Sequence, residues 1–455
     1  MPPLEEQVKI LSDENRQLKE KIHLLELELK EYRDKIFKKN KKSRHDDEDD
    51  DRDNLPPGKK GAPLGHTGTT RKTPDYFDDH KEVFLSQCPH CHGTDLTKYE
   101  SFDDHYQEDV VIIKKKVTRF RHHEYYCKTC KEIVHGIGEG ELLHSYIGPN
   151  AKSIASFLHF QMALPYRKIR AIFSELFDLD FDPSSCPGFD GQISRNGLEI
   201  YEKLKESLKN QPYLHVDETG WRKDAINYWL WLYANNQIAV YDIEKGRGQS
   251  QIESVLGKTF GGVIISDFLG AYNKILSLKQ RCLVHLLRLI EKWHLYFYDN
   301  AKIKKYLDVL KNLIKKIIKL NARLLKGKMP ADFSVQKADL RGMLKNLLNK
   351  KLEHPKAEKF RLRIAKISDQ LTTCLDYVNV CSHNNFAERL LRNNVIMRKI
   401  TFGNRGDAGI INHQVLMSLI ETAKLHNNNP LSFLYKILTN AKEAQDLIKL
   451  PFSTA

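Results

Sequence analysis

Long apolar runs are absent from this sequence, and no stretch approaches the roughly 20 apolar residues that a transmembrane helix requires. The first eight residues are acidic, whereas a secretory signal peptide opens with a basic segment and continues with an apolar one. These two absences argue against membrane-spanning and exported proteins. We therefore expect a cytoplasmic protein with no membrane partner.

Cysteine is scarce, with eight residues in a chain of 455. Four of the eight form two Cys-x-x-Cys pairs, Cys88 with Cys91 and Cys127 with Cys130, which flank 35 residues. In a reducing compartment this spacing favours a metal over disulfides. Four thiolates complete the tetrahedral shell of a structural Zn²⁺, so we predict a zinc ribbon. The alternative is four ordinary buried cysteines.

The balance of 41% hydrophobic and 29% charged residues is typical of a folded, soluble protein. A chain of 455 residues is too long for one hydrophobic core, so we expect several domains. The formal net charge is +14, and a basic protein of this size usually binds a polyanion, most often nucleic acid. A solvated basic surface without a partner is the alternative.

Two apolar rows with a seven-residue period mark the N-terminus. They consist of Leu4, Leu11, Leu18, Leu25 and Tyr32 in one row and Val8, Asn15, Ile22, Leu29 and Ile36 in the other. This pattern predicts a coiled coil over residues 1–37. A buried Asn such as Asn15 fixes the register and favours a parallel dimer, so we expect a homodimer or a higher oligomer. The alternative is one amphipathic helix that packs on its own chain.

Composition divides the rest of the multidomain α/β chain into further segments. They are a basic, acidic and Gly-rich linker (38–80), the zinc-binding ribbon (81–145), a helical DNA-binding segment resembling a helix-turn-helix (146–210), a catalytic core in two parts (211–284 and 381–425), an all-helical insertion (285–380) and a C-terminal helical tail (426–455). Residues 301–350 of the insertion contain 14 Lys and Arg against 3 Asp and Glu, so we expect it to contact DNA. A structural buttress with solvated lysines is the alternative.

Hydrophobic periodicity predicts the individual elements. Helices are expected near 154–162, 166–177, 194–209, 246–256, 269–276, 306–324, 335–353 and 356–378, and strands at 213–217, 228–233, 237–243, 263–267 and 280–284. Three successive strands, a helix and a strand form the order of the ribonuclease-H-like fold. In that fold the first and fourth strands are parallel neighbours, which would bring Asp217 and Asp267, at the ends of two strands, to one edge of the sheet.

Two carboxylates this close repel each other unless cations separate them, which predicts Mg²⁺ or Mn²⁺ at Asp217 and Asp267. Two such ions can activate the incoming oxygen and stabilise the departing one when a phosphodiester is cut. Glu388, on a predicted capped helix, is the candidate third acid. Its alternative role is an ion pair with Arg392 one turn later. Glu218 competes with Asp217, although adjacent strand residues face opposite sides.

Three motifs around these acids resemble those of the insertion-sequence-sixty-six family of transposases. They read His-Val-Asp-Glu-Thr-Gly-Trp at 215–221, Ser-Asp-Phe-Leu-Gly-Ala-Tyr at 266–272 and Asn-Phe-Ala-Glu-Arg-Leu-Leu-Arg at 385–392. The N-terminal coiled coil, the Gly-rich stretch at 60–66 and the four-cysteine region extend the resemblance over nearly the whole chain. The family usually has Arg-Pro in the third motif, where this chain has Arg392 followed by Asn393.

The resemblance implies that Asp217, Asp267 and Glu388 form the catalytic triad, and that the Cys-x-x-His element of Cys282 and His285 braces the core. It also implies a bacterial, nucleoid-associated DNA transposase that cuts at element ends, transfers the freed 3′-OH to target DNA and works with small accessory proteins of the same element. The alternatives are an inactive zinc-dependent DNA-binding regulator and a ribonuclease-H-like nuclease or resolvase.

Overall fold

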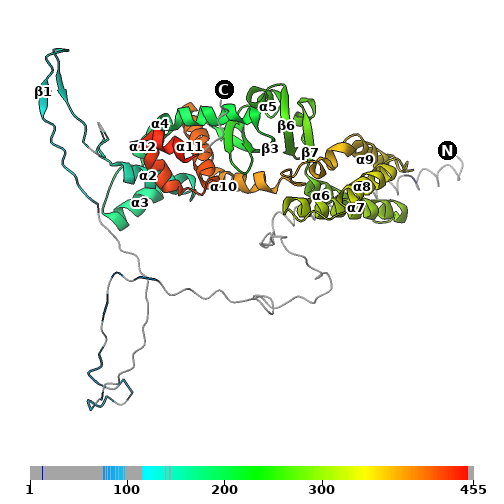
Figure 1. The fold of residues 1–455 in the computed structure, drawn as a ribbon, viewed down its shortest axis with the longest axis horizontal. Helices are drawn as coiled ribbons and strands as arrows, with labels where there is room; N and C mark the ends of the chain where they lie inside the picture. Colours follow the sequence, from blue (N-terminus) through cyan, green and yellow to red (C-terminus); the bar gives the residue numbers. More distant parts are fainter. Residues whose placement is uncertain are drawn as a thin grey trace, which may run out of the picture. The chain divides into compact units, whose positions relative to one another are not determined.

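The computed structural model describes residues 115–138, 140–142 and 145–448, together with Asp13 and isolated positions between 75 and 97. All elements discussed below belong to the compact unit that contains residues 114–455 (Figure 1). The predicted coiled coil other than Asp13, nearly all of the linker, and both Cys88 and Cys91 lie outside the described residues. The predictions that concern them stay predictions.

A five-stranded sheet with the order β5-β4-β3-β6-β7 forms the centre of the unit. Its strands are β3 (Tyr213–Lys223), β4 (Ile226–Ala234), β5 (Ala239–Glu244), β6 (Thr259–Ser266) and β7 (Leu276–Arg281). Strand β4 is antiparallel to both of its neighbours, β3 and β5, whereas β6 runs parallel to both β3 and β7. The prediction that the strands carrying the two aspartates are parallel neighbours is therefore confirmed.

Two strand predictions differ from the structure. The strand expected to end at Asp217 continues to Lys223, because its antiparallel pairing with β4 persists after its parallel pairing with β6 stops at His215. The strand expected at 280–284 lies earlier, at Leu276–Arg281, and the helix expected at 269–276 is a short 3-10 turn at Gly270–Lys274. Polar residues obscured β7 in the sequence, since its Lys279, Gln280 and Arg281 are all buried.

Helices cover the sheet and share one hydrophobic core with it. They include α4 (Cys186–Ser207), α5 (Gln249–Leu256), α10 (Asn385–Thr401), α11 (Asp407–Leu425) and α12 (Pro430–Thr439), while the short α13 (Ala441–Leu447) follows. Helix α11 packs along β5, the edge strand of the sheet. There the hydroxyls of Ser418 and Thr422 accept hydrogen bonds from the β5 backbone N–H groups of Tyr241 and Ala239 (2.8 and 3.1 Å). The edge strand is thereby covered, which removes a site for unwanted strand pairing.

Before the sheet, α2 (Pro149–Phe160) and α3 (Tyr166–Phe177) confirm two predicted helices. The third helix of this segment starts at Cys186 instead of near Ser194, because Pro187 is tolerated in its first turn. A two-stranded hairpin of β1 (Glu124–Tyr126) and β2 (Ile133–His135) precedes these helices. Within the described part of the chain, no helix is long and apolar enough to span a membrane.

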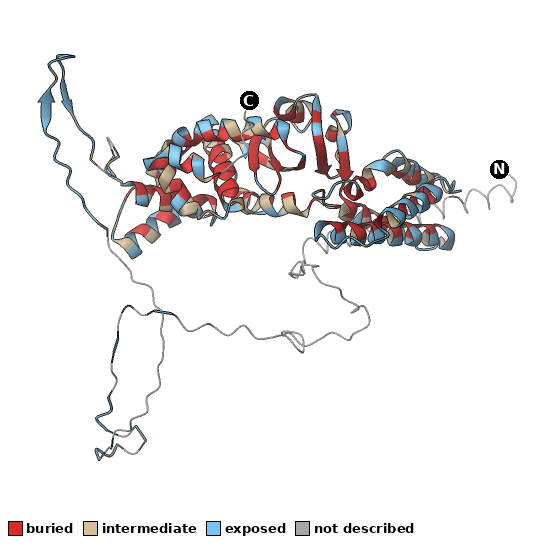
Figure 2. Cartoon of the chain, in the orientation of Figure 1, coloured by how far each residue is buried: buried red, intermediate tan, exposed pale blue. Residues whose placement is uncertain are grey.

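The helical insertion has a hydrophobic core of its own, which reaches the sheet through Val263 and Ile265. It contains α6 (Leu283–Tyr296), α7 (Ala301–Leu325), α8 (Phe333–Leu348) and α9 (Pro355–Ala365). Helix α7 confirms the prediction, whereas α6 was not predicted. The helix expected at 356–378 ends at Ala365 and gives way to 3-10 turns at 368–375. Figure 2 shows buried residues on the inner sides of these helices and exposed ones outside.

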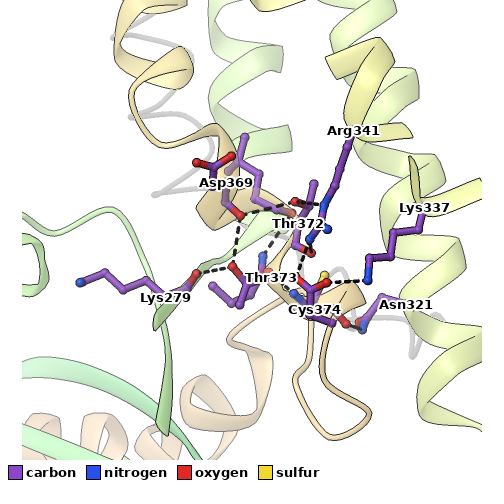
Figure 3. A network of polar contacts seen from close by, with 11 residues as sticks. Lys279, Asn321, Lys337, Arg341, Asp369, Thr372, Thr373 and Cys374 are labelled. Carbon is purple, nitrogen blue, oxygen red and sulfur yellow. Dashed lines mark hydrogen bonds and ion pairs between the residues drawn. The ribbon is translucent and has the colours of Figure 1, made fainter. Parts of the chain in front are cut away.

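A network of polar contacts joins the insertion to the sheet edge (Figure 3). The hydroxyl of Thr373 donates to the backbone carbonyl of Lys279 (2.8 Å), and the backbone N–H of Cys374 donates to the side chain of Gln280 (2.7 Å). From the other side, the amide of Asn321 on α7 donates to the Cys374 carbonyl (2.9 Å). Strand β7 and helix α7 are therefore fixed to the same short turn.

Candidate active site

The three predicted acids sit on three different elements of the core. Asp217 lies on β3, two residues beyond its last parallel pair with β6. Asp267 follows Ser266, the last residue of β6. Glu388 lies in the first turn of α10, which packs against β3. The parallel pairing of β3 with β6 and the packing of α10 bring all three acids to one region.

The electrostatics of Asp217 reflect this proximity. Burial, together with the charges of Glu218, Asp267 and Glu388, raises the pKa of its carboxyl to about 8, while a hydrogen bond from the backbone of Glu218 opposes the shift. A carboxyl with this pKa is mostly protonated at neutral pH. A bound cation would reverse that preference, because an opposite charge nearby favours the ionised form.

Glu388 has a carboxylate oxygen that lacks a hydrogen bond. Its Oε1 atom is buried without a hydrogen-bond donor, and Nε2 of His285 lies 3.8 Å away. No ion pair joins Glu388 to Arg392 in the described part of the chain, so the structure gives no support to the alternative role. A buried carboxylate oxygen without a donor is poorly stabilised unless another positive group approaches it.

The donor set fits a hard divalent cation. All three side chains offer carboxylate oxygens, the ligands that Mg²⁺ and Mn²⁺ prefer, and the oxygen of Glu388 is available. Among the described residues, no three His, Cys, Asp or Glu side chains gather closely enough to enclose one ion by themselves. An Mg²⁺ ion held here would need waters or substrate phosphate to complete its coordination.

Asn384 connects the elements of the candidate site and was not singled out from the sequence. It is fully buried just before α10, where its Oδ1 lies 2.9 Å from the His215 ring and its Nδ2 donates to the Val216 carbonyl (3.1 Å). Its backbone N–H donates to Sγ of Cys282 (3.3 Å). Asn384 therefore ties the start of the Glu388 helix to the strand that carries Asp217. Nothing local in the sequence marks it, because its partners come from distant segments.

Arg281 supports Asp267 in a similar way and was also missed. This buried guanidinium donates to the backbone carbonyl of Asp267 (2.8 Å) and to the hydroxyl of Ser266 (3.2 Å). It also donates to the side chain of Asn273 (2.6 Å) in the turn that follows. These bonds fix the backbone at the end of β6, and with it the position of the second acid.

Glu218 lies beside the triad but has other partners. Its carboxylate accepts hydrogen bonds from Arg247 (2.8 and 3.0 Å) and from the hydroxyl of Tyr272 (2.9 Å). The Arg247 guanidinium in turn stacks 4.3 Å from the ring centre of Trp229. Burial raises the pKa of Glu218, and the hydrogen bonds from Arg247 and Tyr272 oppose that shift. Because Glu218 is held by these partners, Asp217 has the freer carboxyl of the two.

The Cys-x-x-His element lies at the base of the insertion. Cys282 is the N-cap of α6 and is fully buried, and its backbone N–H donates to the Ser266 carbonyl (2.9 Å). His285, one turn later, brings its ring next to Glu388. The element thus contacts both β6 and the region of the third acid.

Half of the predicted zinc site lies in the described residues. Cys127 and Cys130 occupy the turn between β1 and β2, where the backbone N–H of Lys131 donates to the Cys127 carbonyl (2.8 Å). Hydrogen bonds from the backbone of Cys130 and Thr129 lower the pKa of Cys127 to about 7. A thiol with this pKa is partly ionised at neutral pH, as a metal ligand must be.

Comparison with known proteins agrees with this geometry. A family model described as "Transposase IS66 family" matches residues 144–410, which is more than half of the chain and contains Asp217, Asp267 and Glu388. The matched region runs from just before α2 into α11 and includes the whole sheet and the helical insertion. No curated protein matches the chain.

Proposed function

Because the chain belongs to the IS66 family of transposases, we propose that it cuts and joins DNA at the acidic site formed by Asp217, Asp267 and Glu388. The observation that carries the proposal is the buried carboxyl of Asp217, whose pKa rises to about 8 with Asp267 and Glu388 among the causes. Such clusters of acids with shifted pKa values occur mainly at functional sites. The sheet order, with β3 between β4 and β6, supports a ribonuclease-H-like core of the Asp-Asp-Glu type.

Asp217, Asp267 and Glu388 would hold two Mg²⁺ or Mn²⁺ ions. Ions bound there supply activation of the attacking oxygen and stabilisation of the leaving one. The protein's own contribution is to hold the acids in register: Arg281 fixes the backbone of Asp267, and Asn384 fixes the start of the Glu388 helix. Small displacements of such groups cost large factors in rate.

The same site would serve two successive reactions. First, water attacks the phosphorus at an element end, the bond to the 3′ oxygen breaks, and the 3′-OH leaves. Second, that 3′-OH attacks a target phosphodiester, whose own 3′ oxygen departs as the new bond forms. Each step exchanges one phosphorus–oxygen bond for another, so neither needs a redox partner.

DNA would lie across the basic surface of the insertion. Helix α7 exposes a series of cations to solvent: Lys302, Lys305, Lys315, Lys316, Lys319, Arg323 and, at its C-cap, Lys326. Contacts between such residues and phosphates provide affinity without reading sequence. The zinc ribbon and helices α2–α4 would recognise the terminal repeats, and the N-terminal coiled coil would pair two protomers.

The test is cleavage of a labelled duplex that carries the element's own ends, in Mg²⁺ or Mn²⁺. Asp217→Asn and Glu388→Gln should each abolish nicking while end binding stays near that of the wild type. Asp224→Asn is the matched control, because Asp224 is an exposed acid in the turn after β3 and should cut normally. Nicking at the wild-type rate by Asp217→Asn would refute the proposal. Cleavage without joining would identify a nuclease, and no cleavage by the wild type would favour an inactive binding protein.

A further inference from the structure

Helix α10, which carries Glu388 in its first turn, continues for almost four more turns beyond this residue (Figure 1). Residues three or four positions apart share a face of a helix. Starting from Glu388, steps of four, three and four residues lead to Arg392, Val395 and Lys399, which therefore lie on one face with it. Arg392 and Lys399 are exposed. Phe402, three residues beyond Lys399, continues the same line at the C-terminal end of α10. The line therefore leads from a catalytic acid over two cations to an aromatic ring.

Phe402 is unusual in both its exposure and its backbone. Its side chain is 79% exposed, and its φ of 61° places it in the left-handed region. A bulky residue there is strained, and glycine or asparagine is the usual choice at the end of a helix. An exposed ring contributes little to the core, so folding alone gives no reason to keep phenylalanine here. Strain of this kind accumulates at functional positions.

The turn that follows holds Phe402 rigidly. Gly403 has a φ of 98°, and a Cβ on it would lie only 2.2 Å from the Arg222 carbonyl oxygen. Asn404 donates through its backbone N–H to the same carbonyl (2.9 Å), and its side chain accepts a hydrogen bond from the Trp221 indole (2.8 Å). The ring is thus presented to solvent on a fixed support, with little conformational entropy left to lose on binding.

The surroundings of Phe402 carry mainly positive charge. Lys399 and Arg405 are exposed and lie three residues before and after Phe402 in the sequence. Arg222, also exposed, lies on β3, whose backbone contacts the turn after Phe402. Asp407 is already engaged by Lys223. An aromatic ring bordered by cations suits a partner that offers flat apolar faces between negative charges, which describes the bases and phosphates of DNA.

We propose that Phe402 is a base-contacting wedge of the transposase, which inserts against the bases of the element-end DNA while Arg392 and Lys399 contact its backbone. Fourteen residues of helix at 1.5 Å each separate Phe402 from Glu388, or about 21 Å. At 3.4 Å per nucleotide, the contacted base lies about six nucleotides from the cleaved bond. The inference rests on the proposed function of the acid site, and its test separates the two.

The experiment uses the full-length protein and a duplex of the element's own end, with 2-aminopurine placed in turn at positions four to eight from the cleaved bond. Asp217→Asn is the background, so that binding is observed without cleavage. We expect a several-fold rise in fluorescence at one position on binding, because a wedge unstacks the base. Adding Phe402→Ala should remove the rise and weaken binding roughly tenfold, whereas Phe402→Trp should retain both.

Ile400→Ala is the matched control, because Ile400 is an exposed apolar residue (43%) on the same helix, about 100° around the helix axis from Lys399. It should behave like the background protein. An equal rise with Phe402→Ala, or no rise at any position, would overturn the wedge. If Phe402→Ala instead changes the mass of the DNA-free protein in light scattering, Phe402 belongs to a contact between protein chains, and the wedge proposal is overturned. Cleavage of the unlabelled duplex by the wild type, measured in parallel, tests the proposed function separately.

Discussion

Metal-free Asp217 should destabilise the folded protein at neutral pH. Its pKa is raised from 3.8 to about 8, so between these values the folded protein binds more protons than the unfolded chain. Stability therefore falls as the pH rises through this window and levels off above it. At pH 7 the shift corresponds to about 4 kcal/mol in the free energy of unfolding. Asp217→Asn removes the titration yet keeps an oxygen that can accept from the Glu218 backbone N–H, now 3.0 Å away.

Urea denaturation in EDTA across this pH range measures the effect. Asp217→Asn should be the more stable protein at pH 7 to 8, and its stability should depend less on pH. Mg²⁺ at a hundred times its Kd should narrow the difference without reversing it, because it adds about 2.7 kcal/mol to a protein that binds it, which is less than the penalty of about 4 kcal/mol. Asp224→Asn, with its exposed carboxyl, is the control and should match the wild type. A variant no more stable than the wild type at pH 8 without metal would refute the reasoning.

Two further predictions concern the buried Asn321 of the insertion and the cysteines of the predicted zinc ribbon. Asn321→Leu removes a buried side chain that donates to the Val380 carbonyl and accepts from the Ser382 N–H (2.9 Å each), so it should cost about 3 kcal/mol in urea denaturation and slow cleavage. The exposed Asn312 on the same helix is the control, and Asn312→Leu should change stability by less than about 0.5 kcal/mol. Cys130→Ser should lower the zinc content measured by mass spectrometry, whereas Cys186→Ser, at a buried cysteine outside the ribbon, should not.

The sequence predicted the parts of the fold whose signals are local. An apolar strand followed by an acid is visible within a few residues, so the residue pattern alone could assign Asp217 and Asp267 to neighbouring strands. Helices α3 and α7 followed from their apolar spacing. The helix pattern alone could not assign Glu388 to the site, because a Glu on a capped helix is also typical of an ordinary surface ion pair. The two aspartates made Glu388 the candidate third acid, and the resemblance to a family implied the same role.

The supporting residues could not be predicted because their partners lie far away in sequence. Arg281 occurs in a polar stretch that reads as surface, yet it is buried by contacts with Asn273 and Gln370. Asn384 looks like a helix cap, while its side chain actually bonds to β3, about 170 residues earlier. Burial of such groups depends on tertiary packing that brings three segments together. Local periodicity carries no information about that packing.

The position of the insertion shows how a long helical segment can separate two of the proposed catalytic acids in sequence while both stay near Asp217. Hydrogen bonds join the two ends of the insertion, where the chain leaves the sheet and where it returns. The backbone N–H of Leu283 donates to the Ser382 carbonyl (2.9 Å), and the backbone N–H of Asn384 donates to Sγ of Cys282 (3.3 Å). Segments whose ends meet can be inserted into a core at little cost. These contacts at the base of the insertion, with those of Asn384 to β3, hold the start of the Glu388 helix next to β3. Contacts at the base should therefore matter more for catalysis than contacts at the far end of the insertion.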